Sequence, residues 1–385
     1  MIAYIVCLGA TLVFTNSAEK CLNKKNKMLW IFFSVLAIFV PAFFAGIRAE
    51  TVGRDISYYV SNIFEYAVKY DYGKYIDICN KTSVEIGYCI FVYVVSIISK
   101  DLHFLLFFIQ LVPCASVYYF AYKNRENSKM IFVMLIYLLT LYLKSYTIMR
   151  QSMALGIIMI SIIKFKEGKY ISTIIAFFIA IMFHNSAVMA LIVYAIIYIN
   201  NFKRLSSRSK RIIYIMMIGI LSLVVLEYKN IIYIFTYNIP VLPSKFYNYL
   251  SSNYYSNNLE IVKTDAILKM VCMFFSVFLI FAKAEKKKND DNIYVFFLII
   301  DIIIFILSFK MTNISRIGYY FFYPSIMYLI PRFLTVFKDD KTNRMGPYLI
   351  FISVLLSFWI YTYPIKKDCE TYPYKSDIIT IFNYL

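Results

Sequence analysis

The chain has 385 residues, of which 61% are hydrophobic and 16% are charged, and its formal net charge is +18. A soluble protein of this length needs far more polar surface, so the composition excludes that class and predicts an all-α polytopic integral membrane protein. The basic residues cluster in short stretches between apolar runs, which favours contact with anionic membrane lipid over nucleic-acid binding.

Apolar runs recur along the chain, and we predict about 12–13 transmembrane or re-entrant helices, since a spanning helix needs about 20 residues and shorter runs are often re-entrant. The first run has no basic segment before it and no small-residue cleavage site after it. We therefore expect a first span with its N-terminus outside rather than a removed signal peptide. The runs are 2–15, 29–46, 86–99, 102–122, 130–148, 151–163, 171–184, 187–199, 212–226, 266–282, 293–309, 317–334 and 347–363.

Lys and Arg concentrate in certain connections between these runs, and the positive-inside rule predicts that these connections are cytoplasmic. Residues 47–85 and 227–265 then form larger extracytoplasmic loops of a single integral membrane domain over 1–385. This arrangement requires that 86–99 does not cross, so we predict a re-entrant or interfacial helix there and both termini outside. The basic connections are 19–27, 123–129, 164–169, 202–211, 283–288 and 332–344.

The outer segment 54–80 is amphipathic. Its apolar residues recur at helical spacing with Lys, Asp and Glu between them, which predicts amphipathic helices in the extracytoplasmic loop. These residues are Ile56, Tyr59, Val60, Ile63, Phe64 and Ala67.

Unusual polar residues gather at the predicted outer ends of the helices. Ionisable groups at the border of the hydrocarbon are costly, so they tend to be paired or functional. Each one alone is more often an interfacial side chain or a salt-bridge partner, but their convergence on one face indicates a site. They are Arg48, Arg54, Asp55, Glu85, Arg150, His184 and Arg316.

Two further features of the sequence can be explained by helix packing or ion pairing rather than by a functional site. Ser152, Ala154 and Gly156 follow Arg150 and favour a close contact between helices. Asp301 lies in the middle of an apolar run, where we expect it to pair with Lys144 or Lys269, and the sequence does not choose between them.

An ordered set of short motifs resembles the EpsG-like, Wzy-type bacterial polysaccharide polymerase family, and the resemblance covers nearly the whole chain. No single motif is specific; their order is. Where the family usually has Thr or a similar residue before the aspartate of the first motif, this chain has Arg54. The motifs are AGIRAETVGRDISYY at 45–59, EIGY at 85–88, MRQSMALGIIMIS at 149–161, FHNSA at 183–187, ISRIGYYF at 314–321 and YPYKS at 372–376.

The resemblance implies a glycosyltransferase of the bacterial cytoplasmic (inner) membrane whose active site faces the outside or the periplasm. Such enzymes polymerise oligosaccharide repeat units carried on undecaprenyl diphosphate into O-antigen, capsule or exopolysaccharide. The implied partners are that lipid-linked oligosaccharide and membrane lipid, and a chain-length regulator protein is a candidate partner.

The reaction suggests roles for the polar residues. A leaving diphosphate develops negative charge, and arginine meets phosphate oxygens with paired donors, so Arg48, Arg150 and Arg316 are candidates for holding it. The acceptor hydroxyl needs a base near neutral pH. His184 is the first candidate, with Asp55 and Glu85 as alternatives. Further candidates for contacting the substrate are Arg54, Tyr58 and Tyr59.

Cofactor and metal signals are absent from the sequence. There is no glycine-rich phosphate loop, no acidic pair of the DxD kind in the predicted outer loops, and no repeated cysteine spacing among the seven cysteines. We predict metal-independent catalysis without a cofactor, and cysteines that serve packing.

Two other classes of function stay open. An O-antigen ligase or a transferase that uses a phosphoprenol-linked sugar needs the same phosphate contacts, and its product would distinguish it. A lipid-linked oligosaccharide flippase is the third candidate. Transporters commonly have two similar halves and polar groups at mid-depth; this sequence shows no internal repeat, and its polar residues lie at one face.

Overall fold

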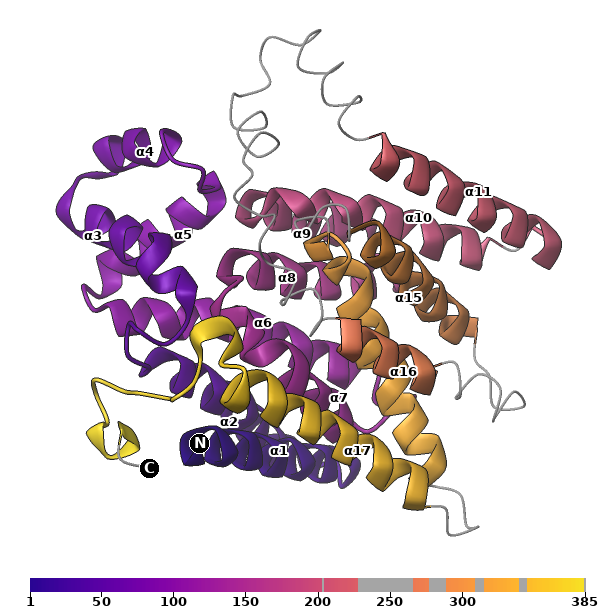
Figure 1. The fold of residues 1–385 in the computed structure, drawn as a ribbon, viewed down its shortest axis with the longest axis horizontal. Helices are drawn as coiled ribbons and strands as arrows, with labels where there is room; N and C mark the ends of the chain where they lie inside the picture. The colour runs from indigo at the N-terminus through magenta and orange to yellow at the C-terminus, as the bar shows by residue number, and fades with distance from the viewer. Residues whose placement is uncertain (203, 228–265, 277–288, 309–314, 339–344, 384–385) are drawn as a thin grey trace, which may run out of the picture. The chain divides into compact units, whose positions relative to one another are not determined.

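The computed structural model describes residues 1–202, 204–227, 266–276, 289–308, 315–338 and 345–383. Helices make up most of these residues, and the β-structure recorded there is an isolated bridge between Arg48 and Ser376. This confirms the predicted all-α class. The chain divides into two compact units (Figure 1), the first formed by Met1–Val188 with Met327–Leu385 and the second by Met189–Ile326. The single domain over 1–385 stays a prediction, and residues 228–265 of the second predicted loop lie outside the described residues.

The first unit contains most of the sequence motifs. Its helices are α1 (Ile2–Asn23), α2 (Lys27–Gly46), α3 (Ser61–Lys69), α4 (Tyr72–Asn80), α5 (Ile86–Ile98), α6 (Leu102–Lys123), α7 (Met130–Tyr137), α8 (Met149–Lys166), α9 (Tyr170–Phe183) and α17 (Met345–Ile360). The second unit contains α10 (Ala190–Asn201), α11 (Ser207–Leu226), a helix over Ala266–Ser276, and α15 (Asn289–Ser308). Helix α16 (Tyr319–Lys338) begins in the second unit and ends in the first.

Local capping explains where several helices begin. Asn26 accepts a hydrogen bond from the Leu29 amide at the start of α2, over 3.1 Å. At the start of α6, Asp101 accepts one from the His103 amide over 2.9 Å. A side-chain oxygen at this position satisfies a backbone donor that the helix itself leaves without a partner.

Among the described residues, three helices are long and apolar enough to cross a membrane by length and composition: α1, α2 and α6. Together with the shorter apolar helices, they support a membrane protein. The number of crossings, about twelve by the sequence pattern, stays a prediction. The shorter apolar helices are Ile86–Ile98, Met130–Tyr142, Tyr170–Phe183, Asn185–Asn201, Ala266–Ser276 and Leu349–Ile365.

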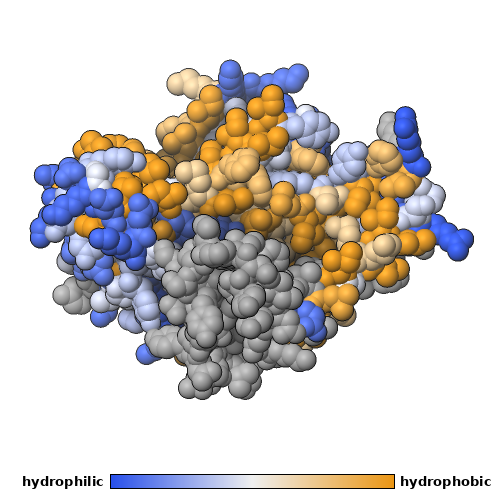
Figure 2. All heavy atoms as spheres, turned by 90° about the horizontal axis from the view of Figure 1, so that it is seen from above, coloured by the Kyte–Doolittle hydropathy of each residue, from blue (hydrophilic) through white to orange (hydrophobic). Residues whose placement is uncertain are grey.

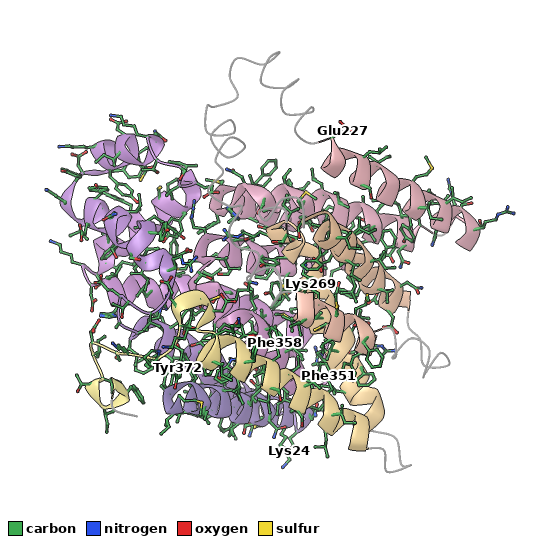
Figure 3. The ribbon with its side chains drawn as sticks, in the orientation of Figure 1. Lys24, Glu227, Lys269, Phe351, Phe358 and Tyr372 are labelled. Carbon is green, nitrogen blue, oxygen red and sulfur yellow. The ribbon has the colours of Figure 1, made fainter. Side chains whose placement is uncertain are left out.

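One end of the first unit collects connections that were predicted to be cytoplasmic. Lys123 forms an ion pair with Glu167 over 2.6 Å, so the loops after α6 and α8 meet there. The Met130 amide donates to Glu19 over 3.1 Å, which adds the loop after α1. Lys24 lies at this end of α1 (Figure 3).

The other end of the first unit collects segments that were predicted to lie outside. The His103 imidazole, at the start of α6, contacts the Gly46 carbonyl at the end of α2 over 2.9 Å. Arg48 lies over the ring of Tyr146, just before α8 begins, at 4.0 Å. Tyr372 lies here too, near the N-terminal end of α1 (Figure 3). Within the first unit, the described members of the two predicted sets therefore lie at opposite ends.

Helix α5 begins and ends at this same end of the unit. Glu85 precedes it and contacts Arg150 in the first turn of α8, while His103, four residues after Ser99, contacts the end of α2. Its 13 residues extend about 20 Å, less than the roughly 30 Å of a hydrocarbon core. These positions agree with the predicted re-entrant or interfacial helix over 86–99.

The outer segment folds as amphipathic helices, as predicted. A π-helical turn over Ile56–Val60 continues into α3, and its apolar residues are buried in a core shared with α4, α5 and α6. Figure 2 shows hydrophilic side chains gathered at the left of the molecule, where Figure 1 places α3 and α4. The buried residues are Ile56, Val60, Ile63, Phe64 and Ala67.

Helices α6 and α8 pack closely through a small residue. A Cβ added at Gly156 would lie 3.0 Å from the Ser116 side chain and 3.2 Å from the Pro113 backbone. The structure therefore confirms the helix-contact interpretation of Gly156.

A buried ion pair lies within the second unit. Lys269 contacts Asp301 over 2.5 Å, and the two side chains are 3% and 0% exposed. Of the two partners that the sequence left open for Asp301, the structure selects Lys269. Pairing of this kind offsets the free-energy cost of burying a charge in each of two apolar helices.

Replacing Gly87 by Ala is expected to destabilise the protein by about 1–3 kcal/mol, because the added methyl group overpacks the contact between α5 and α9. Its Cβ would lie 2.5 Å from the Cβ of Met182 and 2.8 Å from the Met182 carbonyl oxygen. Thermal unfolding of the solubilised protein measures the change. Gly9→Ala is the control, since nothing lies within 4 Å of that position; an equal loss in both variants would contradict the packing argument.

Candidate active site

Glu85 is the centre of a polar cluster at the outer end of the first unit. One of its carboxylate oxygens accepts a hydrogen bond from the Arg150 guanidinium. The other lies 2.8 Å from Nδ1 of His184 and 3.3 Å from the backbone amide of Asn185. A carboxylate, a guanidinium and an imidazole from three separate motifs are therefore in direct contact.

The ends of three helices position these side chains. Glu85 immediately precedes α5, Arg150 lies in the first turn of α8, and His184 immediately follows α9. Because α9 packs against both α5 and α8, the three ends are held by helix packing. Side chains supported in this way are placed more rigidly than side chains on a free loop.

A second layer of contacts holds Arg150. Its guanidinium lies 4.5 Å from the centre of the Tyr59 ring, and the Tyr59 hydroxyl donates to Asp55 over 3.0 Å. The same Asp55 oxygen accepts from the Met149 amide over 2.9 Å. Asp55 thus satisfies a free donor at the start of α8 and holds the ring on which Arg150 rests.

The partners of Glu85 favour its ionised form. Burial alone raises the pKa of the Glu85 carboxyl, but the hydrogen bond with His184 and the charge of Arg150 outweigh burial, so the pKa lies below its ordinary 4.5. The side chain of Glu85 is 8% exposed, against 18% for Arg150 and 26% for His184. The imidazole is therefore the member of the cluster most open to a ligand.

We expect the stability that Glu85 provides to depend on pH. Because folding lowers its pKa, this stability is present above the ordinary carboxyl pKa of 4.5 and is lost as the pH falls through the lower folded value. The unfolding temperatures of the parent protein and of Glu85→Gln should differ by a constant amount at neutral and mildly acidic pH. Their difference should shrink below about pH 4.5; a difference that persists in strong acid would contradict this account.

The contact with Glu85 also selects a tautomer of His184. A carboxylate can only accept, so Nδ1 carries the proton, and Nε2 of a neutral imidazole is then an acceptor. In the described part of the chain no hydrogen bond to Nε2 is formed. A ring nitrogen that is open to a ligand, with its opposite nitrogen held by a carboxylate, is the arrangement of a general base.

Arg48, predicted among the substrate-binding residues, does not contact this cluster. It is 1% exposed. Its guanidinium donates to the backbone carbonyls of Ala45 and Val52 and lies on the Tyr146 ring. Because Ala45 belongs to the last turn of α2, Arg48 satisfies a helix-end carbonyl and closes the following loop. It holds this loop through contacts with the protein backbone.

Two other predicted residues of the first unit also lie outside the contacts of Glu85. Arg54 forms an exposed ion pair with Glu370 over 2.9 Å, and Tyr58 is 63% exposed. Arg316 is an exposed residue of the second unit. Within the first unit, therefore, the expected clamp of several arginines is reduced to Arg150.

Sequence reasoning missed Tyr88 and the central role of Glu85. The buried ring of Tyr88 packs against Tyr59 at 5.9 Å, one helical turn from Glu85. Both residues belong to the motif at 85–88, so the sequence does mark them. It does not show that this motif lies next to Arg150 and His184 in the folded protein.

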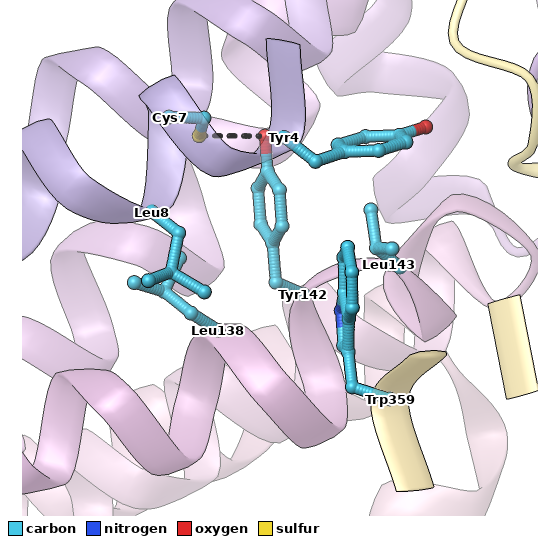
Figure 4. Close-up of a pocket in the computed structure, with 7 residues that line it drawn as sticks. All are labelled: Tyr4, Cys7, Leu8, Leu138, Tyr142, Leu143 and Trp359. Atoms are coloured by element: carbon cyan, nitrogen blue, oxygen red, sulfur yellow. Dashed lines mark hydrogen bonds between the residues drawn. The ribbon is translucent and has the colours of Figure 1, made fainter. Parts of the chain in front are cut away.

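A small cavity lies away from the cluster, between α1, α17 and the turn over Leu138–Tyr142 (Figure 4). Its volume is about 10 Å³, room for roughly one water molecule, so it is too small for a sugar. Tyr142 accepts a hydrogen bond from Cys7 at its wall. The lining residues are Tyr4, Cys7, Leu8, Leu138, Tyr142, Leu143 and Trp359.

Comparison with known protein families matches residues 29–376 to the EpsG family. Neither the curated proteins nor the solved structures contain a match. The family match covers most of the chain and includes every residue of the cluster around Glu85. It supports a polymerase-like role in polysaccharide biosynthesis for a membrane protein. The chain therefore belongs to the EpsG family.

Proposed function

We propose that this protein is a glycosyltransferase that polymerises undecaprenyl-diphosphate-linked oligosaccharide repeat units on the outer face of the bacterial cytoplasmic membrane. The family match supports the polymerase-like role. The observation that carries the proposed chemistry is the contact of Glu85 with both Arg150 and His184. These residues supply an oriented base and a permanent cation side by side.

His184 acts as the general base in this proposal. Its Nε2 takes the proton of the acceptor sugar hydroxyl while the hydroxyl oxygen attacks the anomeric carbon of the donor. Glu85 holds Nδ1 and stabilises the imidazolium that forms. The base is therefore kept in the tautomer and orientation that the step needs.

The donor bond breaks as the new glycosidic bond forms. The anomeric carbon releases the oxygen of the lipid diphosphate, which leaves with the bonding electron pair, so no separate acid is required. Arg150 is the cation next to the base, and its remaining donors face the developing charge. Because Arg150 is already paired with Glu85, further cations must come from parts of the site beyond this cluster.

Asp55 and Tyr59 act indirectly. Asp55 is engaged by the Tyr59 hydroxyl and the Met149 amide, so in this proposal it is a positioning residue and His184 is the base. Tyr59 supports the guanidinium of Arg150.

The cluster lies at the end of the first unit opposite the basic connections around Lys123 and Glu167. Basic connections are retained in the cytoplasm, so this end would face outward. Lipid-linked repeat units would be joined there after their transfer across the membrane.

The product tests this proposal. Purified protein in liposomes should convert a synthetic undecaprenyl-diphosphate-linked repeat unit into a ladder of longer lipid-linked chains. Addition of one repeat to a lipid A acceptor without a ladder would instead indicate a ligase. Movement of intact substrate between leaflets without a new glycosidic bond would indicate a flippase.

We expect the reaction to proceed in excess chelator at its full rate. Both acids near Arg150 are already engaged by protein donors, and the described residues contain no group of His, Cys, Asp and Glu suited to hold a metal ion. The rate of polymer formation with and without EDTA measures this. Loss of activity in EDTA that Mg²⁺ or Mn²⁺ restores would contradict it.

A further inference from the structure

We propose that residues 370–376, named here the C-terminal strap, are a positioning segment of the active site. The strap holds the loop over residues 47–54, which connects the end of α2 to Asp55. This inference rests on the proposed function, because it assigns the strap a part in placing Arg150. The strap lies more than 300 residues away from that loop in the sequence, yet it contacts the loop at several points.

The first set of contacts joins the strap to the end of α2. The Tyr374 hydroxyl donates to the Phe44 carbonyl over 2.8 Å. The Ser376 hydroxyl donates to the Ile47 carbonyl over 2.6 Å. Both side chains are buried, so these bonds form where water does not replace them, and losing one leaves a buried carbonyl without its partner.

The second set joins the strap to the loop itself. The Ala49 amide donates to the Lys375 carbonyl over 2.8 Å, and the Gly53 amide donates to the Glu370 carbonyl over 2.9 Å. The loop is thereby held at both of its ends. The exposed pair of Arg54 and Glu370 adds a further link, but exposed pairs contribute little.

The backbone of the loop has little conformational freedom between these contacts. Gly53 has φ +100°, and a Cβ there would lie 2.9 Å from the carbonyl oxygen of Tyr146, so the backbone of the loop passes directly over the segment before α8. Arg48 closes the loop from inside by donating to Val52. Two residues after Gly53, Asp55 meets the start of α8.

The strap therefore acts on the site through Asp55. Asp55 satisfies the Met149 amide and holds Tyr59, which supports Arg150. If the strap is loosened, we expect Asp55 to lose its fixed position and Arg150 to turn away from Glu85. The family match extends to residue 376, the last residue of the strap.

Thiol labelling tests the first half of this inference in the full-length protein. Val52→Cys places a reporter in the loop at a position that is 2% exposed in the parent. Adding Tyr374→Phe and Ser376→Ala should speed labelling at residue 52 about tenfold or more. Mass spectrometry of that peptide separates it from the seven native cysteines. Unchanged labelling would overturn the inference.

Ser325→Ala is the matched control. Ser325 is also buried, but its hydroxyl donates over 2.6 Å to Phe321 one turn earlier in the same helix. This control should leave labelling at residue 52 and polymer formation unchanged. Faster labelling in the control would show a general loss of stability and would also overturn the inference.

Activity tests the second half. The variant Tyr374→Phe with Ser376→Ala should make less polymer. The acid limb of its pH–activity profile should move to higher pH, because removing the positive charge of Arg150 from the Glu85–His184 pair favours the protonated, inactive form of that pair. Faster labelling with an unchanged profile would mean that the strap holds the loop but does not position the site. If the parent protein makes no polymer, the proposed function fails, while labelling alone still decides whether the strap fixes the loop.

Discussion

Replacing Glu85 by Gln is expected to lower the rate of polymer formation by about 10²-fold or more, while leaving the protein in the membrane at its normal level. Gln has nearly the same shape, but it removes the charge that faces Arg150 and weakens the hold on Nδ1 of His184. Both the cation and the base then lose their orientation in one substitution. Polymer length in cells and the rate in liposomes measure the effect.

Glu167→Gln is the matched control for this substitution. Glu167 is also a carboxylate paired with two cations, Lys123 and Lys169, and these pairs lower its pKa to about 2. It lies at the opposite end of the first unit, so its loss should leave polymer formation unchanged. Equal losses in the two variants would contradict a site at Glu85.

Glu85→Ala should be worse for folding than Glu85→Gln. It leaves Arg150 partly buried without its carboxylate, and breaking a buried pair in this way costs about 3–5 kcal/mol. Because the Arg150 side chain keeps 18% exposure, the lower end of that range is expected. Reduced protein level in the Ala variant alone would agree with this.

Replacing His184 by Ala is expected to lower the rate of polymer formation by about 10²–10⁴-fold, the usual contribution of a general base. The loss should appear in the rate at saturating substrate, because the imidazole acts on the reacting proton and contributes little to binding. Glu85 keeps its pair with Arg150 in this variant, so we expect the fold to persist. Rates over a range of substrate concentrations measure this effect.

The chain supplies its own control for the imidazole. The other histidine, His103, contacts the Gly46 carbonyl at 2.9 Å and lies outside the Glu85 cluster. His103→Asn keeps a donor at the position of Nδ1 and should retain polymer formation. A variant of His184 that makes long chains at the parent rate would exclude this residue as the base.

Much of the fold follows from the apolar runs in the sequence. Their spacing and the positions of the basic connections predicted which ends of α1, α2, α6 and α8 lie together, because charge in short connections is a strong signal. The amphipathic pattern over 54–80 likewise predicted which residues of α3 are buried. The structure adds the exact helix ends, which local capping by residues such as Asp101 fixes.

The site was predictable only in part. Glu85, Arg150 and His184 stand out in the sequence because each is ionisable beside an apolar run, and the structure brings them together. Arg48 matched the same pattern but is buried against carbonyl groups. A sequence shows that a polar residue lies at a helix end, but not whether it turns toward the backbone or toward a ligand.

Long-range contacts account for the rest. The role of Asp55 depends on the Met149 amide, 94 residues later, and the role of Ser376 depends on Ile47, 329 residues earlier. Neither pairing has a local signature, because hydrogen bonds of these kinds form between any serine, carboxylate or backbone group that packing brings close. Only the packed structure identifies them.

The purified protein in liposomes offers the most direct measurement of the claim that Glu85 and His184 form one catalytic unit. The rate of chain extension is compared among the parent, Glu85→Gln, His184→Ala and the double variant. We predict that the double variant is about as slow as the slower single variant, because residues that act together do not lose activity additively. If the losses multiply, or if either single variant extends chains at the parent rate, the account is contradicted.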